Sequence, residues 1–235
     1  MARKPRQGVA ARFLRGVGRL LRGVVLFGLG YLVFCLLLLV AYRFIQPPAT
    51  TVQAQRSVER LVGGESPAFA YAPIEADAMD ADIRRAVVAS EDARFYQHFG
   101  FDLVELRRAR EDAIRRGRPM RGASTITQQL VKNLFLTTHR SWVRKGLEIP
   151  LTFAAELVLP KERILTLYLN VAEWGPGVFG IEAAAQHHYG TSASSLSRTQ
   201  ASRLAAVLPN PLERDPDNMG GTASRIRQRM AQMGW

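Results

Sequence analysis

The side chains that could carry acid–base chemistry gather in two segments of the 235-residue chain. The first, residues 90–102, reads S-E-D-A-R-F-Y-Q-H-F-G-F-D and contains two adjacent carboxylates, Glu91 and Asp92. They end an apolar-periodic stretch and precede an aromatic-rich turn, so this helix end is either solvated or partly desolvated. Desolvation raises the pKa of a carboxyl group and makes it a better proton acceptor near neutral pH. We therefore take Glu91 as a candidate general base, with a solvated helix end as the alternative.

The second segment, residues 121–136, combines an apolar ridge with polar side chains. Ile126, Leu130 and Leu134 recur four residues apart, as on the buried face of a helix, and Ser124 is a candidate N-cap. A helix buried along that ridge leaves hydroxyls, amides and one ammonium facing elsewhere. These polar side chains are Ser124, Thr125, Thr127, Gln128, Gln129, Lys132 and Asn133.

Five motifs, in order, resemble the signature motifs of the peptidoglycan glycosyltransferases, glycosyltransferase family 51. E-D-x-x-F-x-x-H-x-G-x-D at residues 91–102 resembles the first motif, and G-x-S-T-I-T-Q-Q-x-x-K-N at 122–133 resembles the second. R-K-x-x-E at 144–148 resembles the third, K-x-x-I-L-x-x-Y-L-N at 161–170 the fourth, and the stretch 196–209 the fifth. Each motif alone is weakly specific, but together they extend over more than half of the chain.

The resemblance implies both a fold and a reaction. The fold would be mainly α, a lysozyme-like two-lobed helical domain, which agrees with helix patterns that follow one another without an alternating β pattern. The substrate would be lipid II, an undecaprenyl-pyrophosphate disaccharide-pentapeptide. Its 4-hydroxyl group would attack the anomeric carbon of the lipid-linked growing chain with inversion and expel the pyrophosphate. The product would be the β-1,4 glycan of peptidoglycan.

The motif positions imply roles for individual residues. Glu91 would be the general base, and Glu148 would be the second carboxylate, at the donor site. The leaving pyrophosphate needs cations to take its charge. The pyrophosphate-binding residues would be Lys132 and Arg140, assisted by Arg144 and Lys145. The substrate-binding residues would be Asp92, His98, Ser124, Thr125, Gln128, Gln129 and Asn133, with His98 also organising its loop through hydrogen bonds.

The net charge of +12 does not indicate nucleic-acid binding, because seven of these charges precede residue 23 and 12 minus 7 leaves +5 for the rest. The sequence also requires no cofactor held by protein ligands. His187 and His188 are adjacent on a predicted helix, where side chains point about 100° apart, and no third ligand follows at suitable spacing. No protein metal site is therefore predicted, although a divalent cation, Mg or Mn, is compatible with the substrate's pyrophosphate.

The N-terminal part of the chain predicts a membrane anchor. Residues 23–42 are uncharged and span about 30 Å as a helix, the hydrocarbon thickness of a bilayer. A cleaved signal peptide is the alternative, but its apolar region usually measures about 7 to 15 residues. The basic residues before the anchor place the N-terminus in the cytoplasm and the catalytic part on the periplasmic side of a bacterial inner membrane.

These observations divide the chain into a basic cytoplasmic tail (1–22), a transmembrane helix (23–42), a linker (43–60) and a peptidoglycan glycosyltransferase domain (61–235). Two adjacent prolines predict an extended linker over residues 46–56. The expected partners are lipid II and the growing lipid-linked glycan, the membrane, and proteins of cell-wall synthesis or division. In the domain, capping signals predict helices that begin at Asp77 or Asp80, Asp102, Ser141 and Ser197, with Pro150 kinking or breaking the third of these.

Some features depart from the family or leave other functions open. Thr166 and Gln200 stand where the fourth and fifth motifs commonly carry Glu. No lysine has a Ser three residues before it, so an S-x-x-K penicillin-binding nucleophile is absent and a monofunctional enzyme is expected. A lysozyme-like glycan hydrolase would use similar carboxylates but has no use for clustered cations. An inactive membrane-anchored cell-wall-binding protein is the other alternative, and the intact Glu91 and Glu148 argue against it.

Overall fold

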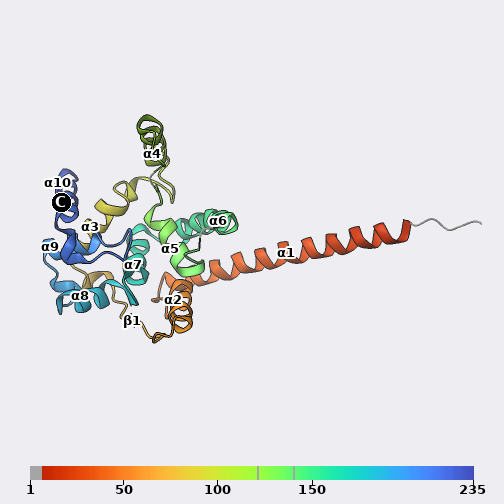
Figure 1. The fold of residues 1–235 in the computed structure, drawn as a ribbon, viewed down its shortest axis with the longest axis horizontal. Helices are drawn as coiled ribbons and strands as arrows, with labels where there is room; N and C mark the ends of the chain where they lie inside the picture. Colours follow the sequence, from red (N-terminus) through yellow and green to blue (C-terminus); the bar gives the residue numbers. More distant parts are fainter. Residues whose placement is uncertain (1–6, 121, 140) are drawn as a thin grey trace, which may run out of the picture.

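The computed structural model describes residues 7–120, 122–139 and 141–235. Within these residues the chain is mainly helical, with one small sheet (Figure 1). The helices are α1 (Gln7–Tyr42), α2 (Thr51–Val62), α3 (Ala81–Glu91), α4 (Leu103–Arg116), α5 (Ile126–Phe135), α6 (Trp142–Val158), α7 (Lys161–Val171), α8 (Ile181–Tyr189), α9 (Arg198–Ala205) and α10 (Gly220–Gln232). The strands are β1 (Ala70–Tyr71), β2 (Glu173–Gly175) and β3 (Val178–Phe179).

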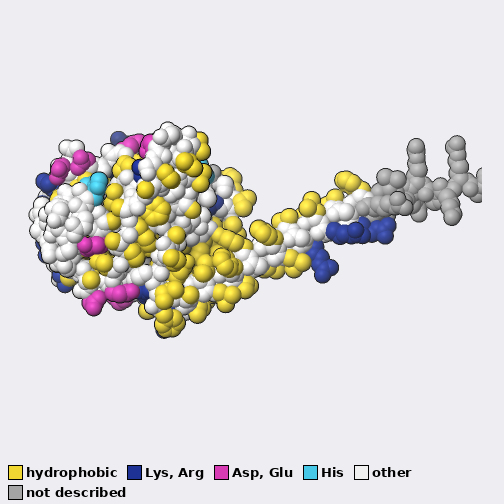
Figure 2. Space-filling view, turned by 90° about the horizontal axis from the view of Figure 1, so that it is seen from below, with side chains coloured by type: hydrophobic (Ala, Val, Ile, Leu, Met, Phe, Trp, Pro, Cys, Tyr) yellow, Lys and Arg dark blue, Asp and Glu magenta, His cyan; other side chains and the backbone are white. Residues whose placement is uncertain are grey.

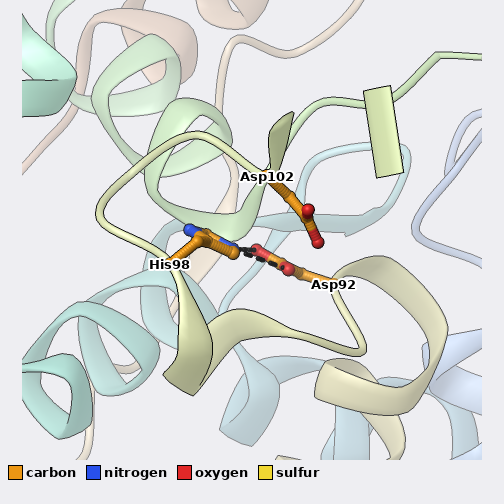
Figure 3. Close-up of side chains that lie close together, drawn as sticks. All are labelled: Asp92, His98 and Asp102. Carbon is orange, nitrogen blue, oxygen red and sulfur yellow. Dashed lines mark hydrogen bonds and ion pairs between the residues drawn. The ribbon is translucent and has the colours of Figure 1, made fainter. Parts of the chain in front are cut away.

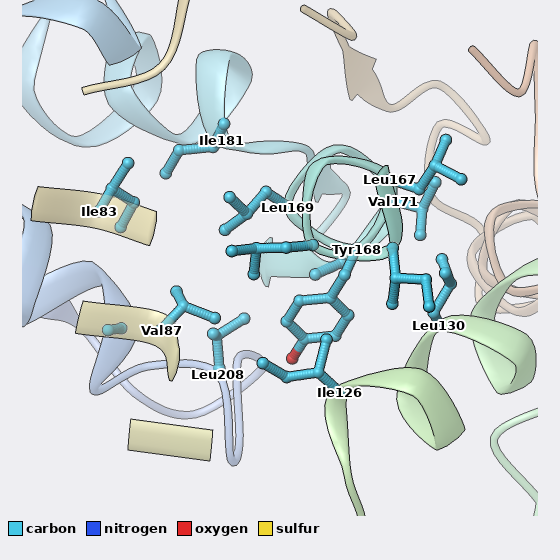
Figure 4. Close-up of a cluster of buried hydrophobic side chains, with 14 of the residues drawn as sticks. Ile83, Val87, Ile126, Leu130, Leu167, Tyr168, Leu169, Val171, Ile181 and Leu208 are labelled. Atoms are coloured by element: carbon cyan, nitrogen blue, oxygen red, sulfur yellow. The ribbon is translucent and has the colours of Figure 1, made fainter. Parts of the chain in front are cut away.

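The hydrophobic core is built around α7 (Figure 4). Every residue of this helix from Ile164 to Val171 is buried, because α5, α6 and α8 pack around it. Burying one aliphatic side chain contributes about 1.5–3 kcal/mol, so the core gives α7 a fixed position. Figure 4 shows the ring of Tyr168 among aliphatic side chains of neighbouring elements. They include Val87 of α3, Ile126 and Leu130 of α5, and Leu208.

The sheet holds distant parts of the chain together in the order β1-β3-β2. β1 pairs parallel with β3, and β2 pairs antiparallel with it. The sequence did not predict β2 and β3, because strands of two or three residues are too short to show alternation. After β3, Gly180 has a φ of +86°, and a Cβ there would lie 2.7 Å from the backbone oxygen of Asn170. Only glycine lets this turn approach α7 so closely.

The N-terminal helix α1 projects from one end of the globular body (Figure 1). Within it, Phe13–Tyr42 is the one described helical stretch long and apolar enough to span a membrane. Its final part packs on α6, where Leu39 is fully buried. Arg163 of α7 donates to the backbone oxygens of Tyr42 at 2.8 Å and Ile45 at 2.6 Å. The end of the apolar helix is therefore part of the folded body rather than a free tether.

Exposed apolar side chains gather on the body where α1 leaves it (Figure 2). Trp142, Phe153 and Leu157 of α6, which packs against α1, are among the exposed large hydrophobic residues. Basic side chains stand near the opposite end of α1 (Figure 2). This distribution fits a single-pass membrane anchor whose far end is basic.

Helix α2 corrects one sequence prediction. The extended linker expected over residues 46–56 is wrong, because α2 occupies the second half of that segment. Thr50 and Gln53 form a capping box, in which the side chain of each bonds to the backbone N–H of the other. Arg56 then binds the carboxylate of Glu173 in β2 at 2.9 Å. The capping box and this tertiary ion pair outweigh the extended preference of the two prolines before them.

Four other helices begin at their predicted capping residues. Asp80, Asp102, Ser141 and Ser197 each accept a backbone N–H at the start of α3, α4, α6 and α9, so the predicted N-caps are confirmed. Pro150 lies inside α6, which continues to Val158, so the helix is not broken there.

Candidate active site

One cleft, with a volume of about 870 Å³, holds most of the predicted site residues. Its walls come from the end of α3, from α4, from the start of α5, from the first turns of α6 and from α10. The predicted residues that line it are Glu91, Asp92, Ser124, Thr125, Gln128, Gln129, Lys132, Arg144, Lys145 and Glu148.

Glu91 is the last residue of α3 and lines the cleft. One carboxylate oxygen accepts the amide of Gln129 at 2.8 Å, and the other accepts the hydroxyl of Ser90 at 3.4 Å. Burial raises the pKa of Glu91, while these two hydrogen bonds and the charges of Lys132 and Arg214 oppose the rise. Glu91 is therefore a better proton acceptor than an exposed carboxylate, as a general base must be.

Gln129 connects Glu91 to the core. Its amide nitrogen donates to Glu91, and its amide oxygen accepts the hydroxyl of Tyr168 at 3.0 Å. Tyr168 is 1 % exposed, and burial together with the charges of Glu91 and Asp92 raises the pKa of its hydroxyl. The hydroxyl therefore remains a donor and fixes which end of the amide faces Glu91. The family motifs predict Gln129 as a substrate-binding residue. The hydrogen bonds of Gln129 show that it also orients the candidate base, Glu91.

Lys132 follows one turn after Gln128 and Gln129 on α5. Burial lowers the pKa of its ammonium, the charge of Arg144 lowers it further, and the charges of Glu148 and Glu91 act in the opposite direction. Among the described residues, none forms a hydrogen bond or an ion pair with this ammonium. A partly desolvated cation without a partner is unfavourable, so an anion that enters the cleft gains a favourable interaction here.

Glu148 is 3 % exposed on α6 and is held by two cations of the same helix. Arg144 and Lys145 bind its two carboxylate oxygens, and the Lys145 Nζ–Oε2 distance is 2.7 Å. The spacings of four and three residues place both cations on the Glu148 face of the helix, as the sequence predicted. The three groups carry one net positive charge, and the charges of Arg144 and Glu148 lie close enough to Lys132 to influence its pKa.

Helix α5 begins one residue later than predicted. Thr125, not Ser124, is the N-cap: its oxygen accepts the Gln128 N–H at 3.2 Å, and the Gln128 side chain accepts the Thr125 N–H at 3.1 Å. This capping box satisfies two backbone donors, whereas Ser124 offers no such reciprocal partner. The Thr125 hydroxyl also donates to the backbone oxygen of Gly100 at 2.7 Å and so holds the first-motif loop against α5.

Asp92, His98 and Asp102 converge beside the cleft, with potential ligand atoms within 4.8 Å of one another (Figure 3). Asp92 accepts His98 Nε2–H at 2.9 Å and the backbone N–H of Ile126 at 3.1 Å. Asp102 accepts two backbone N–H groups at the start of α4, and Arg94 lies 3.3 Å from its other oxygen. Through these bonds the cluster ties the first-motif loop to α5 and α4.

Two predicted residues, His98 and Asn133, do not line the cleft. Arg140 lies outside the described residues. His98 turns toward Asp92 within its own loop, as its predicted organising role requires, and a substrate contact of His98 stays a prediction. Asn133 is buried and does not line the cleft, because one residue beyond Lys132 the helix turns the side chain by about 100°. Conversely, the residues at the cleft or behind it that the sequence did not indicate include Tyr168, Arg229 and Gln232.

Comparisons with known proteins identify the family of the chain. A family model described as Transglycosylase matches residues 63–233. The biosynthetic peptidoglycan transglycosylase of Chromohalobacter salexigens is 47% identical over 210 residues, covering 88% of this chain and 89% of that protein. Proteins of the same name from Pseudomonas putida and a Jannaschia species are 44% identical over 227 residues and 48% identical over 236 residues. They cover 92% and 98% of this chain, and 91% of each relative is covered. The predicted lysozyme-like, mainly helical fold is thereby confirmed, and the chain belongs to the peptidoglycan transglycosylase family of glycosyltransferases.

Proposed function

We propose that this transglycosylase polymerises lipid II into β-1,4-linked glycan and releases undecaprenyl pyrophosphate. One observation carries the proposal: a single cleft contains a half-buried carboxylate of raised pKa, Glu91, and a half-buried ammonium without a described partner, Lys132. Displacement at a sugar pyrophosphate requires such a base together with cations for the leaving group. A glycan hydrolase releases no phosphate, so the cation group favours the transferase.

In the proposed reaction, Glu91 accepts the proton of the lipid II 4-hydroxyl group. The oxygen of that hydroxyl group forms a bond to the anomeric carbon of the growing chain at the same time. The bond from that carbon to the pyrophosphate oxygen breaks, and the electron pair leaves with the pyrophosphate. Attack from the side opposite the leaving group inverts an α-linkage into a β-1,4 linkage. Gln129 keeps the Glu91 carboxylate oriented for this transfer.

In this proposal, the cations of α5 and α6 stabilise the negative charge that develops on the pyrophosphate. Lys132 offers an ammonium whose desolvation a phosphate oxygen would relieve. Arg144 and Lys145, held by Glu148, supply two further cations at fixed positions, and Arg140 is proposed as a fourth. Because Glu148 is committed to Arg144 and Lys145, we assign it the positioning of the donor-site cations.

We further propose that α1 anchors the chain in a bacterial inner membrane with residues 1–22 in the cytoplasm and the catalytic domain in the periplasm. The apolar stretch and the basic end of α1 support this orientation. Proteins of cell-wall synthesis or division are proposed partners at that surface. A periplasm-dependent reporter fused after Trp235 is expected to be active, and activity of a cytoplasm-dependent reporter there would overturn the orientation.

The function is tested with purified full-length protein and labelled lipid II in detergent. We expect glycan polymer and undecaprenyl pyrophosphate to appear in step, one pyrophosphate for each bond formed. A protein that leaves lipid II unchanged but shortens preformed glycan would be a hydrolase, and the proposal would be wrong.

A further inference from the structure

The C-terminal helix α10 forms a wall of the cleft that no sequence motif indicated. Arg229, Gln232 and Met233 line the cleft together with Glu91. In Figure 1, α10 lies with α3 and α9, whereas α5 and α6 lie on the side of the body from which α1 projects. The cleft therefore has one wall that carries Lys132 and Glu148 and another that carries α10.

Helix α10 is a rigid support for its cleft-facing side chains. Ala223, Ile226 and Met230 recur at helical spacing and are buried, and α10 packs on α3 and α9. Beyond the helix, Arg198 of α9 donates to the backbone oxygen of Trp235 at 2.6 Å. The side chains that α10 presents to the cleft are therefore held at a fixed place relative to Glu91.

Arg229 has donors to spare at this place. Its Nη1 donates to the backbone oxygen of Ala89 at 3.0 Å, two residues before Glu91 on α3. Within the part of the chain that the structure describes, no carboxylate forms an ion pair with it. A guanidinium has five N–H donors in a planar fork that matches a carboxylate or a phosphate. The bond to Ala89 fixes the side chain and leaves the rest of the fork for an anion.

We infer that Arg229 and Gln232 form a subsite for an anionic group of the acceptor lipid II. The inference rests on the proposed function, in which Glu91 receives the acceptor's proton while α5 and α6 bind the donor's leaving group. Groups fixed to α3 beside Glu91, away from Lys132, therefore face the acceptor. Its anion is either a carboxylate of the stem peptide or a phosphate of its lipid anchor, and both suit an arginine fork.

The test separates acceptor binding from donor binding. The donor is a lipid-linked tetrasaccharide whose terminal 4-hydroxyl is blocked, held at saturation while lipid II is varied as the acceptor. Arg229→Ala in the full-length protein is expected to raise the acceptor KM about tenfold with little change in kcat, because a charged hydrogen bond present before and during the reaction is lost. The KM of the donor is expected to stay at the wild-type value. Arg229→Lys keeps the positive charge but lacks the planar fork. Its acceptor KM is expected to lie between that of the wild type and that of Arg229→Ala.

Arg225→Ala is the matched control, since Arg225 lies on the same helix but bonds to Thr222 and does not line the cleft. Lipid II with amidated stem-peptide carboxylates identifies the anion. If Arg229 binds a carboxylate, amidation removes the difference between Arg229→Ala and wild type; if it binds a phosphate, the difference persists. Equal effects on donor and acceptor, or an unchanged acceptor KM in an Arg229→Ala protein with wild-type thermal stability, would refute the subsite. A wild-type protein that does not polymerise lipid II would instead refute the proposed function.

Discussion

Replacing Gln129 by Leu is predicted to change the pH dependence of the reaction more than its maximal rate. The Gln129 amide donates to Glu91 at 2.8 Å and stabilises the ionised carboxylate against the burial that raises its pKa. Removing the donor raises the pKa of Glu91 further. A general base must be ionised to act, so the acid limb of the kcat/KM profile moves to higher pH.

The size of the effect follows from the type of bond. A hydrogen bond to a charged group contributes about 1.5–3 kcal/mol, and the lower end applies because Glu91 opens onto a solvent-filled cleft. A change of about 1.4 kcal/mol corresponds to a factor of about ten. We therefore expect Gln129→Leu to lower kcat/KM about tenfold at pH values where Glu91 is mostly protonated, and to change it little at higher pH, where Glu91 is ionised.

The assay measures kcat/KM for lipid II at about eight pH values between roughly pH 5 and pH 9. Tyr168→Phe serves as the comparison variant, because it keeps the bond from Gln129 to Glu91 and removes only the hydroxyl that orients the amide. It should shift the profile in the same direction by a smaller amount. If Gln129→Leu lowers kcat/KM equally at every pH, Gln129 binds substrate and does not tune Glu91.

Three further predictions concern the cations and the anchor. Lys132→Ala should raise KM and lower kcat together, because the pyrophosphate charge is present in the ground state and grows in the transition state, and Lys132→Arg should restore only part of the loss; a change in kcat alone would contradict this. Arg56→Ala should lower the free energy of unfolding by about 2–3 kcal/mol in urea titrations, because it leaves the buried Glu173 unpaired, and adding Glu173→Gln should recover much of it. Deletion of residues 1–45 should lower the thermal unfolding midpoint and the catalytic efficiency without abolishing the reaction. Deletion of residues 1–30 should leave the midpoint unchanged, because it keeps the buried end of α1. Equal midpoints for the two deletions would show that this end of α1 does not stabilise the domain.

Local signals explain which elements could be predicted from the sequence. Asp80, Asp102, Ser141 and Ser197 bond to N–H groups two or three residues away, so their effect is visible within one helical turn. The Thr-x-x-Gln box at the start of α2 is equally local, but the two prolines before it favour extended backbone and so predict a linker instead. The start of α5 was misplaced by one residue, because two neighbouring hydroxyls compete for the same cap and only the reciprocal partner of Thr125 decides between them.

The contacts of the candidate site are likewise of two kinds, those between residues close in sequence and those between residues far apart. The spacing of Arg144, Lys145 and Glu148 on one helix shows directly that they meet. The bond between Gln129 and Tyr168 joins residues 39 positions apart, and the bond between Arg229 and Ala89 joins residues 140 positions apart. Contacts of this kind depend on how α7 and α10 pack, which no local pattern in one sequence reveals. Family motifs therefore predicted the candidate base and cations, while the residues that contact them from α7 and α10 required the structure.

The most direct test of the account is a comparison of Glu91→Gln with wild type in two measurements on the same protein preparation, lipid II binding and single-turnover glycan transfer. Glutamine keeps the size and the hydrogen-bonding ability of the side chain but cannot accept the proton. A general base contributes about 10² to 10⁴ in rate, so transfer should fall by that factor while the Kd for lipid II stays near the wild-type value. Near-normal transfer by Glu91→Gln would contradict the assignment of Glu91 as the base, and Glu148 would become the first residue to examine in its place.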